Sequence, residues 1–134
     1  MARTLSQAVA VRTSSALIRD VRAGVPTSEL DQLASELEMH IEDLATAMRI
    51  SSRTLARRRQ SGTLNIDESE RVVRVARIRD AAVAALGSLD DARVWLITRN
   101  AGLRNATPIS LVDTEPGGEL VRNLLGQIEH GVFS

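Results

Sequence analysis

Apolar residues recur at intervals of three and four along most of the chain, whereas β-branched and aromatic runs are scarce. This spacing places apolar side chains on one face of a helix, so it predicts an all-α fold. The clearest segment begins after Pro26, where Thr27 or Ser28 can cap a helix with this spacing. Its inward positions are Leu30, Leu33, Ala34 and Leu37. An earlier helix over residues 5–22 is also expected, but polar residues interrupt its apolar side, and the pattern fixes no structure for residues 1–20.

Two short helices around a tight turn are expected in residues 41–59, IEDLATAMRISSRTLARRR. Ser51 or Ser52 can cap the second helix, and Gly62 can end it by adopting a left-handed conformation. Ala45 is small at the point where the second helix would cross the first closely. The residues expected to form their shared core are Leu44, Met48, Ile50 and Leu55. This arrangement is typical of a DNA-reading helix-turn-helix.

The second helix of this pair carries the candidate DNA contacts. If Leu55 faces inward, a helical turn of about 100° per residue directs neighbouring side chains outward. The candidates for base edges are Arg53, Thr54 and Arg57. The candidates for phosphate groups are Ser51 and Ser52 at the helix start, together with Arg58 and Arg59.

Two positions in this pair are atypical of a helix-turn-helix. Arg49 occupies the turn position where glycine is usual, and Arg58 stands where a buried aliphatic residue is common. Since short helix pairs are frequent in proteins, the alternative interpretation is a solvated basic helix in a generic bundle.

The longest predicted helix spans residues 67–86 and is apolar over much of its circumference. Such a wide apolar face implies burial against several neighbours or a dimer seam. Arg71, Arg74 and Arg77 recur every third residue along one side and are called the arginine stripe below. The stripe can extend the DNA surface or bind an acidic partner, but we favour a solvated face with pairs such as Glu70 with Arg74.

The carboxy-terminal third is expected to contain two further helices. Gly87 can end the long helix, and Ser88 can cap the short one that bears the single tryptophan. Residues 98–115 are rich in turn residues and are predicted to form a long loop with one helical turn. A last helix is expected over residues 117–130, with Gly131 as its stop. Its inward residues are expected to be Leu120, Val121, Leu124, Leu125 and Ile128.

Charge is unevenly distributed along a chain that is formally neutral, with 17 basic and 17 acidic residues. Residues 49–79 hold nine arginines against three acidic residues, a net charge of +6. Residues 1–48 and 80–134 each hold four arginines against seven acidic residues, a net charge of −3. One concentrated basic segment suggests a local site for a polyanion and different partners for the acidic ends.

The composition argues against several classes of function. There is no cysteine, and His40 and His130 are isolated, so neither a thiol nucleophile nor a metal site is expected. No catalytic constellation emerges and no cofactor is implied, so the chain is predicted not to be an enzyme. No apolar run approaches the roughly 20 residues of a transmembrane helix. A soluble, cytoplasmic protein is therefore expected.

Five segments, in order, resemble those of a known family. They are GVPTSELDQLASEL, RISSRTLARRRQSGTL, DESERVVRVARI, ARVWLITRNAGLRNATPISLVDT and LLGQIEHGVFS. In these segments the chain resembles the Xre/MbcA/ParS antitoxins, which are partnered with RES-domain toxins in type II toxin–antitoxin systems. Arg49 and Asn105 depart from the pattern, the latter at a position where glycine is frequent in the family.

The resemblance implies a two-part protein, with an Xre-like DNA-binding region in residues 1–64 and a toxin-binding domain in residues 65–134. The family's toxins consume NAD, and the carboxy-terminal segment of the antitoxin covers their NAD pocket. On this chain that role falls on Asn100, Ala101, Gly102, Leu103, Ile128, Gly131, Val132, Phe133 and Ser134. The expected partners are a RES-domain toxin and operator DNA, bound by a homodimer that represses its own operon.

Two other classes of protein fit the same residues. One is a stand-alone helix-turn-helix transcription regulator with a partner-responsive carboxy-terminal domain. The other is a structural or adaptor bundle, which would show no salt-dependent DNA binding. A neighbouring gene for a RES-domain protein would separate the antitoxin from both.

Overall fold

The computed structural model describes residues 14–131, and these residues form helices joined by short turns. The elements in order are α2 (Ser14–Ala23), α3 (Thr27–Glu36), α4 (Ile41–Ala47), α5 (Ser52–Ser61), α6 (Ile66–Leu86), α7 (Leu89–Leu96), the 3-10 turns η2 (Ala101–Leu103) and η3 (Pro108–Leu111), and α8 (Glu115–Glu129). The predicted all-α fold is therefore confirmed. Within the described residues, no helix is both long enough and apolar enough to span a bilayer.

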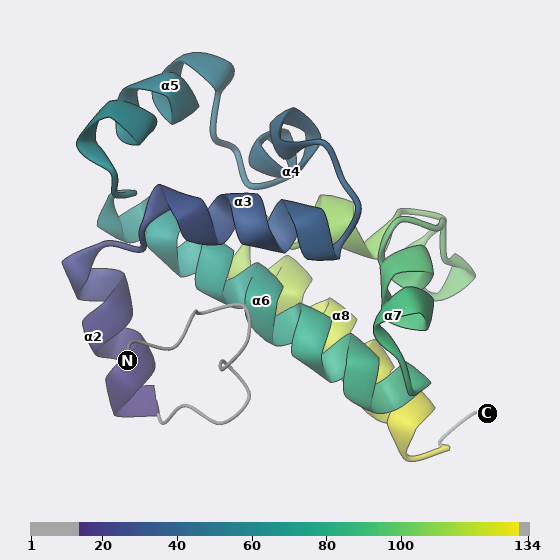
Figure 1. Ribbon diagram of the computed structural model, residues 1–134. Helices are drawn as coiled ribbons and strands as arrows, with labels where there is room; N and C mark the ends of the chain where they lie inside the picture. Colours follow the sequence, from purple (N-terminus) through teal and green to yellow (C-terminus); the bar gives the residue numbers. More distant parts are fainter. Residues whose placement is uncertain (1–13, 132–134) are drawn as a thin grey trace.

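Helix α6 runs through the middle of the molecule and organises the rest (Figure 1). Its Val72, Val75 and Ile78 are buried, and α2, α7 and α8 all pack against it. Of the two explanations for its wide apolar face, burial against several neighbours is thus the one that the structure shows. The large side chains that α3 to α5 add to the core are Leu30, Leu33, Leu37, Leu44, Met48, Ile50 and Leu55.

Local capping signals set several helix ends as predicted. The Ser51 side chain accepts a hydrogen bond from the backbone at the start of α5, and Ser88 does the same for α7. Gly62 and Gly87 end α5 and α6 in the left-handed conformation, with φ of 86° and 96°.

The predicted cap of α3 is wrong. Pro26 occupies the N-cap position and no side chain caps the helix. Thr27 lies inside the first turn, where its backbone N–H donates to the carbonyl of Gly62 at 3.0 Å. The backbone N–H of Thr27 is therefore paired with the residue that ends α5. The sequence around α3 gives no sign of this long-range contact.

The helix expected over residues 5–22 is described from Ser14 onward as α2, and residues 5–13 lie outside the described part of the chain. Leu17 is buried against the core. Ile18, by contrast, is 48% exposed.

The arginine stripe is not a solvated face. Arg74 is only 7% exposed and donates to the carbonyl of Val112 at 2.9 Å and to Glu115 at 3.2 Å. The expected pair with Glu70 is present, with a nitrogen–oxygen distance of 2.5 Å. Of the three arginines in the stripe, only Arg77 is exposed. Arg74 is covered by the segment before α8, whose Val112 carbonyl it contacts.

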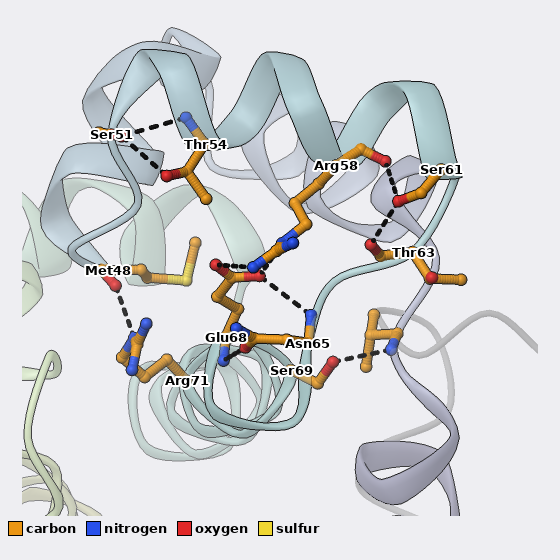
Figure 2. Close-up of polar contacts among 11 residues, drawn as sticks. Met48, Ser51, Thr54, Arg58, Ser61, Thr63, Asn65, Glu68, Ser69 and Arg71 are labelled. Carbon is orange, nitrogen blue, oxygen red and sulfur yellow. Dashed lines mark hydrogen bonds and ion pairs between the residues drawn. The ribbon is translucent and has the colours of Figure 1, made fainter.

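Arg71, the third member of the stripe, is also held by the protein. Its Nε donates to the carbonyl of Met48 at 2.7 Å (Figure 2). Met48 caps the carboxy-terminal end of α4, so a cation there interacts favourably with the helix dipole.

Helix α8 rests on α6 through one narrow side. Val121 and Leu125 are buried, and Leu124 packs partly against the core. Leu120 was expected to face inward, but it is 49% exposed. The reason is that Gly118 and Val121 already occupy the contact with α6, which turns Leu120 away from it.

Candidate functional site

The turn between α4 and α5 is closed by two backbone hydrogen bonds of the Schellman type. The N–H of Ile50 donates to Ala45 at 2.8 Å, and that of Arg49 donates to Thr46 at 3.0 Å. Arg49 itself has a φ of 58°, a left-handed conformation that disfavours side chains other than glycine by about 1 kcal/mol. The usual glycine at this position therefore has a clear conformational reason, and Arg49 adopts the same turn.

The expected shared core between α4 and α5 is confirmed. Ala45 is buried between the two helices, at 1% exposure. Its small side chain lets them approach closely. Leu44, Met48, Ile50 and Leu55 are buried beside it. With Leu55 inward, the opposite side of α5 faces solvent.

The inner side of α5 is fastened to the start of α6 (Figure 2). Arg58 donates to both carboxylate oxygens of Glu68, at 2.7 Å and 3.3 Å. Glu68 also accepts from the backbone of Asn65, while the Asn65 side chain accepts from the backbone of Glu68, which forms a capping box. One carboxylate thus serves both the helix cap and the ion pair.

This environment shifts the pKa of both partners. Burial alone would raise the pKa of Glu68, but hydrogen bonds from Arg58 and Asn65 outweigh it, so the pKa lies below its usual value. The hydrogen bond to Glu68 raises the pKa of Arg58 in turn. The pair is therefore fully ionised near neutral pH.

Arg58 is not placed to contact a DNA phosphate. Its side chain is 22% exposed and points from α5 toward α6, away from the outer side of the helix (Figure 2). This guanidinium is unsuited to bind DNA. If it moved to a phosphate, the nearly buried Glu68 carboxylate would be left without its cation. We therefore correct the predicted role of Arg58 from phosphate contact to structural ion pair.

The remaining predicted DNA residues lie on the outer side or at the start of α5. Arg53 and Arg57 are exposed, one helical turn apart, and neither side chain has a hydrogen bond or ion pair within residues 14–131. Ser51 and Ser52 are exposed at the helix start. Thr54 is partly buried, and its hydroxyl accepts a hydrogen bond from Ser51 at 3.0 Å.

Arg59 is exposed but paired. Its Nη2 lies 2.7 Å from Asp31 of α3, and both side chains are nearly half exposed. Such an exposed pair contributes little to stability, so the guanidinium can exchange its partner at small cost.

The predicted toxin-binding loop, residues 100–103, lies against α8. Asn100 caps η2, with its side chain accepting from the backbone of Gly102 at 2.8 Å. A Cβ on Gly102 would lie 3.5 Å from Cδ2 of Leu124, so the loop and the last helix are in contact. Ala101 and Gly102 are exposed, whereas Leu103 is 3% exposed and belongs to the core. We therefore withdraw Leu103 as a direct contact.

The other toxin-binding candidates lie at the end of α8. Ile128 is partly buried, and Gly131 is exposed with a φ of 67°, as expected of a helix stop. Val132, Phe133 and Ser134 lie outside the described residues. The structure thus brings residues 100–102 and the carboxy-terminal helix to one region of the surface.

Asn105 follows this loop with a φ of 65°, directly after Arg104 with a φ of 55°. Two successive left-handed residues explain why glycine suits this position, and asparagine tolerates the same conformation.

Two exposed apolar residues were not among the predicted site residues. Val94 and Ile97, on and directly after α7, are 60% and 51% exposed. The sequence carries a weak signal for them, because Ala92 and Leu96 are the inward positions of that helix.

Glu115, the first residue of α8, is paired with two arginines. No group of three or more potential ligands in residues 14–131 is placed to hold a metal ion. Glu115 accepts hydrogen bonds from Arg122 at 2.7 Å and from Arg74 at 3.2 Å. The hydrogen bond from Arg122 is the main reason that the pKa of Glu115 lies below its usual value.

Comparison with known proteins matches both halves of the chain. Residues 16–77 match the antitoxin Xre-like helix-turn-helix domain, and residues 81–131 match the antitoxin Xre/MbcA/ParS C-terminal toxin-binding domain. The chain is 36% identical to the Antitoxin Xre of Yersinia enterocolitica over 120 residues, which are 88% of this chain and 81% of that protein. It is 35% identical to the Antitoxin Xre of Photorhabdus laumondii over 113 residues, 83% of this chain and 76% of the relative. The chain therefore belongs to the Xre-type antitoxin family, with a helix-turn-helix domain followed by a toxin-binding domain.

Proposed function

We propose that this antitoxin neutralises an NAD-consuming RES-domain toxin by covering its active site, and that it represses its own operon by binding DNA. The chain acts by binding rather than by catalysis, in the cytoplasm where DNA and NAD are both present. The observation that carries the proposal is the separation of two exposed surfaces on one helical body. The outer side of α5 and the end of α8 lie at opposite ends of the molecule (Figure 1). One chain can therefore engage DNA and a toxin at the same time.

The DNA contacts in this proposal come from α5. Arg53 and Arg57 read base edges in the major groove, because they are exposed and make no contact that would have to break. Ser51, Ser52 and Arg59 contact phosphates. Thr54 takes part at the edge of the surface, since its hydroxyl is already engaged by Ser51.

Residues 65–134 form the toxin-binding region, with α6 as the scaffold that it shares with residues 1–64. The tail, residues 132–134, enters the NAD pocket, and Asn100, Ala101, Gly102, Ile128 and Gly131 contact its rim. The packing of Gly102 against Leu124 supports this proposal, because it joins the loop to α8. The acidic net charge of residues 80–134 also makes DNA an unsuitable partner for this end.

We further propose that the antitoxin acts as a homodimer within the larger toxin–antitoxin complex. A recognition helix of 10 residues reads only a short half-site, so useful specificity requires two copies. The apolar face of α6 supplies no argument for this, because it is covered within the chain.

Affinity purification of the tagged antitoxin from its own host tests the proposal. We expect a stoichiometric protein companion that destroys NAD once it has been separated from the antitoxin, and operator DNA that binds the complex in a salt-dependent manner. If the antitoxin is recovered alone, or with a companion that leaves NAD intact, the proposed toxin class is wrong.

A further inference from the structure

Helix α7 presents an apolar strip to solvent. Val94 and Ile97 are three residues apart, so they lie on the same side of the helix, and they are 60% and 51% exposed. Single exposed apolar side chains are common on protein surfaces, but two adjacent ones on a short helix form a local apolar surface that a partner can cover.

The exposure of this strip is fixed by how α7 is held. Ala92 and Leu96 are buried on its inner side. Arg93 donates to the carbonyl of Glu36 at 3.2 Å and forms an ion pair with Glu38 at 2.8 Å, so it ties α7 to the end of α3. Turning α7 to bury Val94 would break these contacts. The strip therefore stays exposed as long as α7 keeps these contacts.

Acidic residues border the strip at the start of α7. Asp91 is exposed one helical turn before Val94, on the same side of the helix. Asp90 is also exposed and is partly balanced by Arg93 at 2.5 Å. Such a surface repels DNA and complements a protein that offers an apolar patch beside lysine or arginine.

We propose that this outer side of α7, comprising Asp91, Val94 and Ile97, is a second contact with the toxin, outside its NAD pocket. The proposal rests on the toxin-binding function proposed above, and α7 lies wholly within the part of the chain that matches the toxin-binding domain. In this arrangement α7 supplies affinity, whereas the tail supplies occlusion. The toxin carries a matching apolar patch bordered by basic residues.

The division between affinity and occlusion can be measured with purified toxin and full-length antitoxin. We expect Val94→Ser combined with Ile97→Ser to raise the Kd for the toxin by about tenfold to a hundredfold. At saturating concentration this variant still blocks NAD consumption, because its tail is unchanged. The control, Ile18→Ser, removes an apolar side chain that is 48% exposed outside residues 65–134 and leaves the Kd unchanged.

The charged border gives a second readout that a merely structural role would not produce. We expect Asp91→Asn to slow association with the toxin several-fold at low salt and to have no effect at high salt. An unchanged Kd in the double variant would overturn the α7 contact, and so would an association rate of Asp91→Asn that equals the wild-type rate at low salt. If the wild-type antitoxin itself fails to bind an NAD-consuming toxin, the proposed function fails instead, so the two failures are distinguishable.

Discussion

Arg49, in the turn of the helix-turn-helix, forms an ion pair with Asp113, although 64 residues separate them in the sequence. The Nε of Arg49 lies 2.5 Å from Oδ2 of Asp113. The neighbouring Val112 carbonyl accepts from Arg74 of α6. The turn that orients the recognition helix is thus in direct contact with the segment that leads into α8.

This pair leads to a prediction about stability. Arg49→Gly removes the ion pair but suits the left-handed turn, whose φ is 58°. Arg49 is 73% exposed, so we expect the pair to contribute less than about 1 kcal/mol and the glycine to offset that loss. The free energy of unfolding from urea titration should stay level or rise by up to about 1 kcal/mol. A clear loss of stability, matched by Asp113→Asn, would show that the pair is worth more than its exposure indicates.

The Arg58–Glu68 pair should be far more important than the exposed arginines beside it. Arg58→Ala leaves the Glu68 carboxylate, which is 7% exposed, without its cation. We expect the free energy of unfolding to fall clearly, because the carboxylate loses its cation while it remains largely covered by the protein. The matched control is Arg57→Ala on the outer side of the same helix, which should change stability by less than about 0.5 kcal/mol. Equal effects of the two substitutions would contradict the structural role of Arg58.

Two glycines of α8 provide an internally controlled test of the packing around Arg74. A Cβ on Gly118 would lie 2.9 Å from Cδ of Arg74, whose guanidinium is held by three partners. We expect Gly118→Ala to destabilise the protein by about 1 to 3 kcal/mol. Gly126 lies in the same helix with nothing within 4 Å of the added carbon. Gly126→Ala should therefore stabilise the folded protein by about 0.5 to 1 kcal/mol. Thermal melting should show a lower melting temperature for Gly118→Ala and a higher one for Gly126→Ala.

Acid should destabilise the antitoxin through Glu68 and Glu115. The pKa of each carboxyl is lowered in the folded state, so their stabilising contribution is complete above the ordinary value of 4.5 and is lost as the pH falls through the lower folded pKa. We expect the free energy of unfolding to fall when the pH is lowered from about 6 to about 3. Glu68→Gln should flatten part of this dependence. A wild-type stability that stays constant over that range would contradict the assigned ion pairs.

Operator binding should separate the arginines of α5 by role. Arg53→Ala and Arg57→Ala should each cost about 1 to 3 kcal/mol on the operator and reduce its preference over unrelated DNA. Arg59→Ala should weaken binding to all sequences alike and lower the salt dependence. Mobility-shift titrations at two salt concentrations distinguish these patterns, and unchanged binding by all three variants would mean that another element reads DNA.

Features that depend on a few neighbouring residues were predictable from the sequence. The all-α fold, the α4–α5 pair and the caps at Ser51 and Ser88 follow from apolar spacing and local hydrogen bonding. The inward orientation of Arg58 also had a local signal, because the residue stands at a position where a buried aliphatic side chain is common. We nevertheless predicted a phosphate contact for Arg58, and its ion pair with Glu68 explains the anomaly.

Features that depend on distant segments were not predictable. A three-residue repeat at positions 71, 74 and 77 looks the same whether it faces solvent or another element. Arg74 is buried only because Val112 and Gly118, which are distant in the sequence, pack against it in the folded chain. The exposure of Leu120 has the same origin, since the side of α8 that meets α6 is decided by the glycine beside Arg74.

The most direct test of the central claim is a titration of NAD consumption by the purified cognate toxin with full-length antitoxin and with a variant that lacks residues 132–134. We predict that the full-length chain abolishes NAD consumption at a stoichiometric amount. The shortened chain should still bind the toxin but leave NAD consumption largely intact. Complete neutralisation by the shortened chain at the same ratio would contradict occlusion of the active site by the carboxy-terminal segment.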